Sequence, residues 1–591
     1  MCGIIGYIGA RPAGALLFKG LKRLEYRGYD SAGVATLDGG KLEIRKDAGK
    51  ISELDEKLHF ESMAGSMGIA HTRWATHGGV TRENAHPHAD CSGAIAIVHN
   101  GIIENFQELK AELAAKGHSF KSETDSEVIA HLIEDNYKGD LEKAAFEAAK
   151  RLRGSFAVLA VSAKEPGKIV CFKRESPLLV GLGNGEMFAA SDATPIVEYT
   201  RRVVFLEDGE AAALTKDSAK FYSLDDWKPL EKKASTVEWS AEDAGKNGYS
   251  HFMLKEIFEQ PQALKAVIAQ DEKNLAAFAE ELKKAKRVIA VACGTARHSA
   301  VIGKHMLDRV AGKDIEVLIA SEFEYFADRV EPGTIVLAVS QSGETADVLD
   351  GLRRSKAKGA RIMSIVNVKG SSIDRLSERS LYLNCGPEIA VASTKAFMAQ
   401  CAVFYLLAHA MAGKLEKAEG DLRLLSGLVQ QELDAANGKM KEIGEELAKK
   451  QNAYYLGRGV NYAIALEGAL KLKEISYVHA EGMPAGELKH GTLALIEKGT
   501  PVFLLNPEDY TYYESLSNGI ETRARGAKLF GLSNKENKAY DEWIRLPETI
   551  DALLYPFLSI VPLQLIAYYA AVARGNDPDK PRNLAKSVTV K

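Results

Sequence analysis

The second residue of the chain is a cysteine, in the opening sequence MCGIIGYIG. If the initiator methionine is removed, Cys2 carries both a thiol and the α-amine of the chain. A thiol attacks best as a thiolate and therefore needs a base. An α-amine, whose ordinary pKa is about 7.7–8.0, suits that task near neutral pH, directly or through a water molecule. The position predicts a terminal nucleophile; the alternative is a small apolar residue that begins an edge strand.

Four further residues predict what such a nucleophile would attack. Arg73, in HTRWATHG, could grip a carboxylate with two hydrogen bonds. Asn100 and Gly101, in HNGIIEN, could donate to a tetrahedral oxyanion, where one donor is worth about 10²–10³ in rate, although Asn-Gly is also a common turn. Asp125, in SETDSE, could bind an ammonium group. Alternatively, Asp125 or Thr124 could cap the helix that follows. Together they suggest an amino acid with an amide side chain, which is glutamine.

A second group of polar residues follows an apolar run and opens a helix, in SQSGET at 340–345. Free backbone N–H groups at a helix N-terminus bind anions, and Gly343 permits close approach. Glu344 would repel a phosphate and must point away. No Walker A motif occurs, so nucleoside triphosphate binding is not supported. An ordinary capped helix entry is the alternative to a phosphate site whose side-chain donors would be Ser340, Gln341, Ser342 and Thr345.

Glu467, Lys471 and Glu474 lie at i, i+4 and i+7 in ALEGALKLKEISYVHAEG, on one face of a predicted helix. Such a run usually means a solvated, salt-bridged face. Here the intervening residues are largely apolar, so the charges could instead line a cleft. His490 follows in GELKHG, and the tail KPRNLAKSVTVK lacks the periodicity of a core segment, as a frayed basic end also would.

Other clusters are less informative. His86 and His88, in AHPHAD, form an H-x-H pair without an apparent third ligand, and we interpret them as structural rather than metal-binding. Six scattered cysteines contain no C-x-x-C motif, which fits a reducing cytoplasm. The sequence therefore predicts neither a metal site nor a disulfide framework.

Composition limits the possible partners. The chain has 591 residues, of which 46% are hydrophobic and 26% charged, with a formal net charge of −4. This length predicts several domains, and this charge offers no basic surface for nucleic acid. One uncharged stretch, 552–573, is long enough to span a bilayer. This stretch aligns with a predicted helix elsewhere in the chain that contains charged residues, which would not suit lipid. We therefore expect a buried helix and no membrane association.

The elements that must position these residues differ between the two parts of the chain. Residues 1–238 alternate short β-rich runs with helices, as in sheets with flanking helices. Polar residues 239–250 predict a linker. Beyond them the pattern is strand, turn, helix, typical of doubly wound parallel sheets. The predicted α/β domains cover 251–420 and 421–579, followed by a tail, 580–591.

The second part contains a repeat. RVIAVACGTARHSAVIG (287–303) matches AYYLGRGVNYAIALEG (453–468), TIVLAVSQSGET (334–345) matches TPVFLLNPEDYT (500–511), and QCAVFYLLAHA (400–410) matches QLIAYYAAVA (564–573). Order is kept throughout, which indicates a duplicated domain. Only the first copy has the hydroxyl-rich loop, so we expect one phosphate site per chain.

The motifs CGIIGYIG, LEYRGYDSAG, HTRWATHG, NAHPH and VHNGIIEN resemble the glutaminase domain of the N-terminal-nucleophile glutamine amidotransferases. The resemblance implies a four-layer α/β/β/α sandwich, with Cys2 as nucleophile, Asn100 and Gly101 as oxyanion donors and Arg27 bordering the nucleophile. Trp74 would gate the ammonia path. The glutamine-binding residues that it implies are Arg73, Trp74, Thr76, His77, Gly101 and Asp125.

SQSGETADVL, VASTKAF, ALEGALKLKEISY, GELKHG and PRNLAKSVTV resemble the paired sugar-isomerase domains of the isomerising aminotransferases that act on ketose phosphates. The resemblance assigns the phosphate to the 340–345 loop. One position departs from the family, since Ala296 stands where a serine is common near the sugar, which puts substrate affinity in doubt. The implied roles are proton transfer between C1 and C2 by Glu474, assistance by Lys471, ring opening by His490 from a neighbouring subunit, a Schiff base on Lys586, and contact with the sugar by Val391 and Ala585.

The combined resemblance implies conversion of fructose 6-phosphate and glutamine to glucosamine 6-phosphate and glutamate in a cytoplasmic homodimer. It implies no cofactor, pyridoxal phosphate included, and no metal. One alternative is an amidophosphoribosyltransferase, which would need an acidic diphosphate-binding loop after a strand. Another is a non-enzymatic sugar-phosphate sensor, which would need an output module such as a helix-turn-helix. The sequence shows neither feature.

Overall fold

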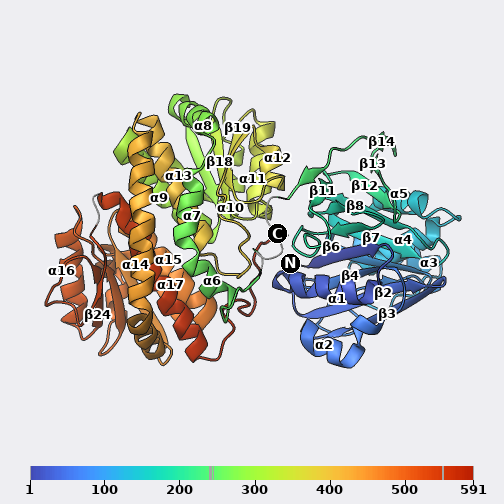
Figure 1. Ribbon diagram of the computed structural model, residues 1–591, viewed down its shortest axis with the longest axis horizontal. Helices are drawn as coiled ribbons and strands as arrows, with labels where there is room; N and C mark the ends of the chain where they lie inside the picture. Colours follow the sequence, from blue (N-terminus) through green and yellow to red (C-terminus); the bar gives the residue numbers. More distant parts are fainter. Residues whose placement is uncertain (1, 238–242, 244, 549–550, 590–591) are drawn as a thin grey trace. The chain divides into compact units, whose positions relative to one another are not determined.

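The computed structural model describes residues 2–237, 243, 245–548 and 551–589, except the side chains of 436 and 437. The chain forms two compact units (Figure 1), which are described separately. Unit 1 comprises Met1–Ala244 with Ser587–Lys591, and unit 2 comprises Gly245–Lys586. Within the predicted linker, 239–250, residues 239–242 and 244 lie outside the described residues.

Unit 1 contains two antiparallel sheets. The first has the order β15-β11-β9-β10-β1-β4-β2-β3 and the second the order β14-β13-β12-β8-β7-β6-β5. The strands of the first are β1 (Gly3–Ile8), β2 (Ser31–Asp38), β3 (Lys41–Ala48), β4 (Met67–Arg73), β9 (Leu179–Leu182), β10 (Met187–Ala190), β11 (Arg202–Phe205) and β15 (Ser235–Thr236). The strands of the second are β5 (His88–Ala89), β6 (Ile95–Ile103), β7 (Gly154–Ser162), β8 (Ile169–Arg174), β12 (Glu210–Leu214), β13 (Ala219–Ser223) and β14 (Pro229–Leu230).

Helices cover the outer face of each sheet. One apolar core lies between the sheets and joins β1 and β4 to β6, β7 and β8. A second packs α1 (Ala13–Leu24) and α2 (Ile51–Leu58) on the first sheet. A third packs α3 (Phe106–Ala115), α4 (Glu127–Asn136) and α5 (Leu141–Arg151) on the second sheet. The predicted α/β/β/α sandwich is therefore confirmed.

Unit 2 contains two five-stranded parallel sheets of identical order, β17-β16-β18-β19-β20 and β22-β21-β23-β24-β25. Their apolar strands are buried on both faces, as parallel strands between helices must be. The predicted duplication is confirmed. The strands are β16 (Val288–Ala292), β17 (Glu316–Ile319), β18 (Ile335–Ser340), β19 (Arg361–Val366), β20 (Arg379–Tyr382), β21 (Asn452–Gly457), β22 (His479–Pro484), β23 (Pro501–Leu505), β24 (Lys528–Ser533) and β25 (Glu542–Arg545).

A shared layer of helices lies between the two parallel sheets of unit 2 (Figure 1), where one apolar core includes residues of both sheets. Helices that are apolar all round are suited to such a position. The helices of unit 2 are α6 (Phe252–Phe258), α7 (Gln260–Ile268), α8 (Glu272–Lys284), α9 (Gly294–Ala311), α10 (Ala320–Ala327), α11 (Ala346–Ala357), α12 (Ser372–Leu376), α13 (Lys395–Met411), α14 (Leu415–Leu447), α15 (Val460–Ser476), α16 (Tyr512–Arg523) and α17 (Tyr555–Ala573).

The uncharged stretch predicted to be a buried helix is α17 with the short turn before it. By length and composition Ala552–Ala573 could cross a membrane, but 83% of its most apolar window is buried within the protein. The helix packs against α14 and α15, and the prediction of a buried helix is confirmed. The predicted domain limits stay predictions, and the limit between residues 420 and 421 falls inside α14.

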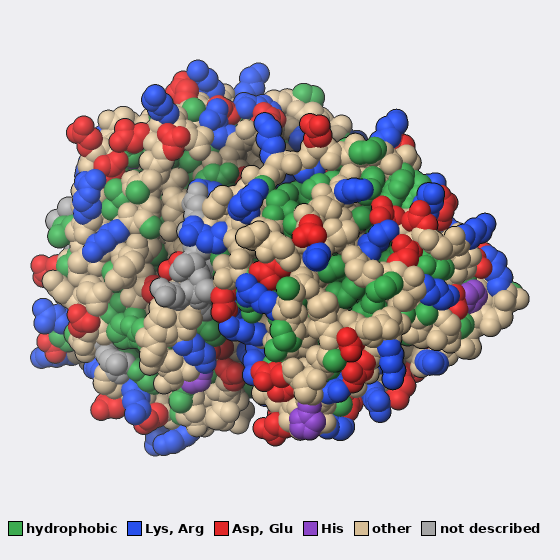
Figure 2. Space-filling model, turned by 45° about the vertical axis from the view of Figure 1, so that its right-hand side comes forward, with side chains coloured by type: hydrophobic (Ala, Val, Ile, Leu, Met, Phe, Trp, Pro, Cys, Tyr) green, Lys and Arg blue, Asp and Glu red, His purple; other side chains and the backbone are tan. Residues whose placement is uncertain are grey.

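The visible surface carries charges of both signs. Figure 2 shows Lys and Arg side chains interspersed with Asp and Glu over the face that it presents. A duplex-binding surface would need a continuous positive stripe. The mixed charge of this face agrees with the small net charge of the chain.

Candidate active sites

Strand β1 places Cys2 beside the end of β4. Gly3 pairs with Thr72 across the two strands, so Cys2 lies opposite Arg73, the last residue of β4. The N–H group of Trp74 donates to Cys2 Sγ at 3.3 Å, and the thiol lies 3.5 Å from the Trp74 carbonyl oxygen. Burial raises the pKa of the Cys2 thiol, while the Trp74 hydrogen bond and the Arg73 charge oppose that rise. The thiol is therefore protonated near neutral pH and needs a base before it attacks.

Asn100, on β6, is held at this site by a buried histidine. Burial lowers the pKa of His71 to about 3, so its ring is neutral. His71 Nε2 lies 2.9 Å from the His99 carbonyl oxygen, an acceptor, and therefore carries the proton. Because Nε2 is also 3.1 Å from Asn100 Oδ1, the amide nitrogen of Asn100 is turned toward Cys2, where it donates to the Cys2 carbonyl oxygen at 3.0 Å.

Gly101 has a conformation that demands glycine. Its φ is +132°, and a Cβ atom there would lie 2.0 Å from the Ser155 carbonyl oxygen of the paired strand β7. A side chain would therefore force β6 and β7 apart. The next donor after Asn100 is thus a backbone N–H group without a side chain.

The Arg73 guanidinium organises the loop after β4. It donates to the carbonyl oxygens of Gly79 at 3.0 Å and Gly78 at 3.2 Å, and also to that of His77. These acceptors are neutral, so they leave the positive charge of Arg73 uncancelled. The loop also contains Trp74, whose ring packs edge-on against Tyr29 at 5.8 Å, and the exposed Thr76.

Asp125 does not cap the helix that follows it. The residue at the N-cap of α4 is Ser126, and no side chain makes a capping hydrogen bond there, so the predicted cap by Thr124 or Asp125 is wrong. Instead, Asp125 Oδ2 accepts the N–H group of Ile103, on β6, at 2.7 Å. The buried Asp125 carboxylate acts electrostatically on both Arg73 and Cys2. The structure thus brings the nucleophile, the cation and the anion of the predicted glutamine site together.

The neighbouring histidines are packed as core residues. The His86 ring lies 4.1 Å from that of His71, in a tilted arrangement, and 4.4 Å from that of His88, edge-on, measured between ring centroids. Burial lowers the pKa of both His86 and His88 well below the ordinary value, so both are neutral. Arg27, also buried, donates to Asp192 at 2.6 Å.

In unit 2 the predicted phosphate loop joins β18 to α11. Ligands of such sheets bind beyond the carboxyl ends of the strands where strand order reverses, here between β16 and β18. Ser340 Oγ accepts the Gly343 N–H group at 3.0 Å and Ser342 Oγ accepts the Glu344 N–H group at 3.2 Å. The loop thereby curls around the N-terminus of α11.

One detail of this loop is compatible with a bound anion, and a second explains its glycine. The Glu344 carboxylate accepts the Ser372 N–H group at 2.8 Å, so it is tied to α12, as the phosphate prediction required. Gly343 has φ +68°, and a Cβ atom there would lie 2.0 Å from Ser371 Oγ. The closeness of this serine leaves room only for glycine.

The charged face of α15 is buried. The side chains of Glu467 and Lys471 are 0% exposed and that of Glu474 is 21% exposed, so a fully solvated face is wrong. Lys471 Nζ lies 2.7 Å from Glu474 Oε2 and 3.4 Å from Glu467 Oε1. Burial alone would lower the pKa of Lys471, but the two carboxylates raise it above the ordinary value. Lys471 is therefore a fixed cation beneath a partly exposed carboxylate.

Residues of the first copy complete this cluster. Thr295, on α9, donates to Glu467 at 3.0 Å and accepts from Lys471 at 3.1 Å. His298 Nδ1 lies 2.7 Å from Glu467 Oε2. Nothing in the local sequence ties these two residues to Glu467, which lies in the other copy. The charged cluster therefore depends on the packing of the two copies.

Lys586 also has an unpredicted partner. Its Nζ pairs with the fully buried carboxylate of Glu388. Glu388 further accepts the N–H groups of Thr394 at 2.9 Å and Ala396 at 3.0 Å, at the start of α13. Burial would raise the pKa of Glu388, but Lys586 lowers it below the ordinary value. The only sequence signal for Glu388 is its place shortly before VASTKAF.

Four other residues of unit 2 were also singled out in the sequence. Val391 donates its N–H group to the Asp579 carbonyl oxygen at 3.1 Å, and Ala585 is half-buried. Ala296 lies on α9 next to Thr295. His490 is exposed on a short 3₁₀ turn, and in the described part of unit 2 no hydrogen bond or ion pair joins it to Lys471, Glu474 or Lys586.

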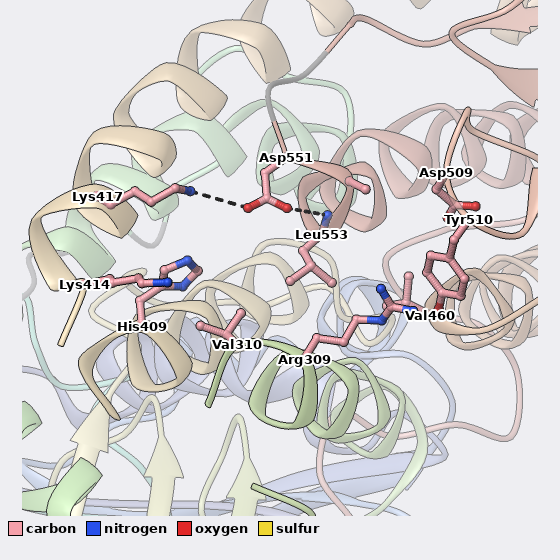
Figure 3. Close-up of a pocket in the computed structure, with 11 residues that line it drawn as sticks. Arg309, Val310, His409, Lys414, Lys417, Val460, Asp509, Tyr510, Asp551 and Leu553 are labelled. Atoms are coloured by element: carbon pink, nitrogen blue, oxygen red, sulfur yellow. Dashed lines mark hydrogen bonds and ion pairs between the residues drawn. The ribbon is translucent and has the colours of Figure 1, made fainter. Parts of the chain in front are cut away.

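A cavity of about 330 Å³ lies beside the loop after β23 (Figure 3). In the second copy this loop corresponds to the predicted phosphate loop of the first. Val460 follows β21 there, and Asp509 and Tyr510 follow β23. Across it Lys417 lies 3.4 Å from Asp551, the ion pair drawn in Figure 3. Its lining residues are Arg309, Val310, His409, Lys414, Lys417, Val460, Asp509, Tyr510, Asp551, Ala552 and Leu553, none of which was predicted as a site residue.

Two family models match the chain. The SIS domain matches residues 281–410 and 446–574, and the glutamine amidotransferase domain matches residues 71–198. The two SIS matches coincide with the two parallel sheets, and the third match lies in unit 1.

Similar proteins cover the whole chain. Proteins named glutamine–fructose-6-phosphate aminotransferase (isomerizing) are 51% identical in Thermococcus kodakarensis, 48% in Pyrococcus horikoshii and 47% in Aquifex aeolicus, each with 100% of both chains covered. A solved C-terminal domain of the glucosamine-fructose-6-phosphate aminotransferase from Francisella tularensis is 36% identical. It superposes with a TM-score of 0.53 and covers 57% of this chain and 99% of its own.

Proposed function

The chain belongs to the glutamine–fructose-6-phosphate aminotransferase (isomerizing) family, and from this premise we propose how its residues perform the reaction. The enzyme converts fructose 6-phosphate and glutamine to glucosamine 6-phosphate and glutamate. Unit 1 supplies the glutamine amidotransferase and unit 2 the paired isomerase domains. The assignment of each step to individual side chains is the proposal.

In unit 1, Cys2 Sγ attacks the carboxamide carbon of glutamine after the initiator methionine is removed. The α-amine of Cys2 takes the thiol proton, a step that the raised pKa of the buried thiol makes necessary. Asn100 and Gly101 donate to the oxyanion. Ammonia leaves, and water then hydrolyses the thioester to glutamate.

The groups around the nucleophile bind the glutamine substrate. Arg73 binds the α-carboxylate, because its charge is not cancelled by its carbonyl partners. Asp125 binds the α-ammonium group, because its buried carboxylate lies close enough to act electrostatically on both Arg73 and Cys2. The other proposed contacts come from the loop after β4 and from β6, and they are Trp74, Thr76, His77 and Gly101.

In unit 2, the hydroxyl-rich loop binds the phosphate of fructose 6-phosphate through Ser340, Gln341, Ser342 and Thr345 and the start of α11. Lys586 forms a Schiff base with the C2 ketone, releasing water, and ammonia replaces the lysine nitrogen at C2. Glu474 then takes the proton from C1 and returns it to C2. Lys471 holds the Glu474 carboxylate in place, and Val391 and Ala585 lie against the sugar.

We also propose a homodimer in the cytoplasm. His490 opens the sugar ring, and its lack of contacts to Lys471, Glu474 or Lys586 in the described part of its own chain supports a contribution from a neighbouring subunit. Six free cysteines support a reducing compartment.

The observation that carries these assignments is the convergence of Trp74, Asn100 and Asp125 on Cys2. Cys2→Ala should abolish glutamine-dependent synthesis while binding of fructose 6-phosphate, measured by calorimetry, stays unchanged. Cys293→Ser, in unit 2, is the matched thiol control and should keep glutamine hydrolysis. Glutamine-dependent product from Cys2→Ala, identified by mass spectrometry, would refute the nucleophile assignment.

A further inference from the structure

A second group of chemically reactive side chains lies in unit 1, in a part that the reaction does not use. Cys91 lies between β5 and β6, His118 follows α3, and His131 and Glu134 lie one turn apart on α4. One ligand atom from each of the four lies within 4.8 Å of all the others. Their residue types, thiolate, imidazole and carboxylate, are those that bind Zn²⁺.

The separations match a tetrahedral metal. With bond lengths of about 2.3 Å to sulfur and about 2.0–2.1 Å to nitrogen and oxygen, a tetrahedral Zn²⁺ places sulfur about 3.6 Å from nitrogen, and nitrogen about 3.3 Å from oxygen. Cys91 Sγ lies 3.6 Å from His118 Nδ1 and 3.5 Å from His131 Nδ1. Glu134 Oε2 lies 3.0 Å from His118 Nδ1 and 3.2 Å from His131 Nδ1.

Hydrogen bonding alone explains this arrangement poorly. Glu134 Oε2 is also 3.1 Å from the N–H group of Cys91, so three nitrogen atoms converge on one oxygen. A carboxylate oxygen has two lone pairs and cannot fully satisfy three donors, and an imidazole with its proton on Nε2 would instead direct its Nδ1 lone pair at this oxygen. A cation at the centre would take one lone pair of Oε2 and those of both imidazole nitrogens, leaving the other lone pair for Cys91 N–H.

The far side of each imidazole fits the same interpretation. A histidine that binds a metal through one nitrogen usually directs its other N–H group toward a carboxylate. His131 Nε2 faces Glu127 Oε1 at 3.7 Å and His118 Nε2 faces Asp135 Oδ1 at 3.8 Å. His131 is almost fully buried, with 1% of its side chain exposed.

We propose that Cys91, His118, His131 and Glu134 form a structural Zn²⁺ site. Four protein ligands fill a tetrahedral shell and leave no open position for a substrate, which is the mark of a structural rather than a catalytic zinc. The metal would cross-link three segments of unit 1, which are the segment before β6, the loop after α3 and helix α4. Those segments border Asn100 and Asp125, so the site would stiffen the support of the glutamine pocket.

The test uses the full-length protein with Cys2→Ala, which removes the other partly accessible thiol of unit 1. Zn²⁺ affinity is measured by competition with a chromophoric chelator, and Co²⁺ substitution reports the ligands spectroscopically. We expect one Zn²⁺ per chain at submicromolar Kd and a thiolate-to-cobalt charge-transfer band. Both should be lost in Cys91→Ser and in His131→Ala, and Glu127→Gln should weaken binding by about 10–100-fold.

His479→Ala, which removes an exposed histidine of unit 2, is the matched control and should bind Zn²⁺ as tightly as the parent. If a ligand variant fails to fold, X-ray absorption of the Zn²⁺-loaded parent should still show one sulfur and two imidazole nitrogens. The absence of submicromolar binding in the parent would overturn the site. So would undiminished binding in Cys91→Ser and His131→Ala, or an absorption spectrum without sulfur.

Discussion

The two isomerase copies share one strand order. They differ in the side chains that precede the helix after the third strand. In the first copy, the helix after the third strand, α11, is preceded by hydroxyl groups, with Gly343 at its entry and Glu344 tied to Ser372. In the second copy, α16 is preceded by Asp509. That carboxylate accepts both the N–H and the hydroxyl group of Thr511 at 2.7 Å, and the amide of Asn461 at 2.8 Å.

The difference shows how one fold can keep or abandon an anion site. A helix N-terminus favours a negative charge, and either a ligand or the protein itself can provide that charge. In the first copy we propose that a phosphate provides this charge, whereas in the second copy Asp509 provides it. The second copy contributes in another way, because its helix α15 presents Lys471 and Glu474 and packs against α9 of the first copy.

The largest effect is expected for Glu474, which we propose as the proton-transfer residue of the second copy. Glu474→Gln should lower glucosamine 6-phosphate formation by about 10²–10⁴-fold, the usual value of a positioned general acid–base group. Glutamine hydrolysis, assayed as glutamate release, should continue. Glu514→Gln, an exposed carboxylate on α16, is the control and should synthesise normally. Full synthesis by Glu474→Gln would remove this residue from the mechanism.

Removal of the buried cation should also lower the stability of the fold. Lys471→Met leaves the buried carboxylate of Glu467 without its closest lysine, and breaking such a pair costs about 3–5 kcal/mol. Chemical denaturation followed by circular dichroism would measure the loss. Lys473→Met, two residues along the same helix but exposed, should change the free energy of unfolding by less than about 0.5 kcal/mol. Equal stability of the two variants would show that the cluster is not a coupled unit.

The phosphate loop provides a smaller and more specific test. Ser342→Ala should raise the KM for fructose 6-phosphate about tenfold, because a hydrogen bond to a charged group is worth about 1.5–3 kcal/mol. Glu508→Gln changes the aligned residue of the second copy, which is exposed, and should leave this KM unchanged. An unchanged KM in Ser342→Ala, or an equal rise in both variants, would contradict a phosphate site confined to the first copy.

The smallest effect concerns Asp509. Asp509→Ala removes the acceptor of the Thr511 and Asn461 hydrogen bonds before α16 and should lower the free energy of unfolding by about 1 kcal/mol, the usual net value of a lost hydrogen bond. Denaturant titration measures that change, and steady-state kinetics should show an unaltered KM for fructose 6-phosphate. A weakened sugar affinity would indicate that the second loop takes part in binding after all.

Local patterns in the sequence determined much of this protein. The duplication, the buried helix α17 and the loop between β18 and α11 all follow from apolar periodicity and turn residues, which depend on near neighbours in the chain. The four-layer sandwich was implied by the resemblance to glutamine amidotransferases, which motifs such as CGIIGYIG and HTRWATHG carry. These features could be predicted because each is encoded within a short segment.

The tertiary structure alone decided which distant residues meet. Lys586 pairs with Glu388, and Thr295 joins Glu467 across the two copies. Asp125 turns from its expected capping role to the N–H group of Ile103, because a buried strand N–H needs an acceptor more than an already wound helix needs a cap. Such contacts form between segments far apart in sequence, and packing of the core, rather than local propensity, sets their distances.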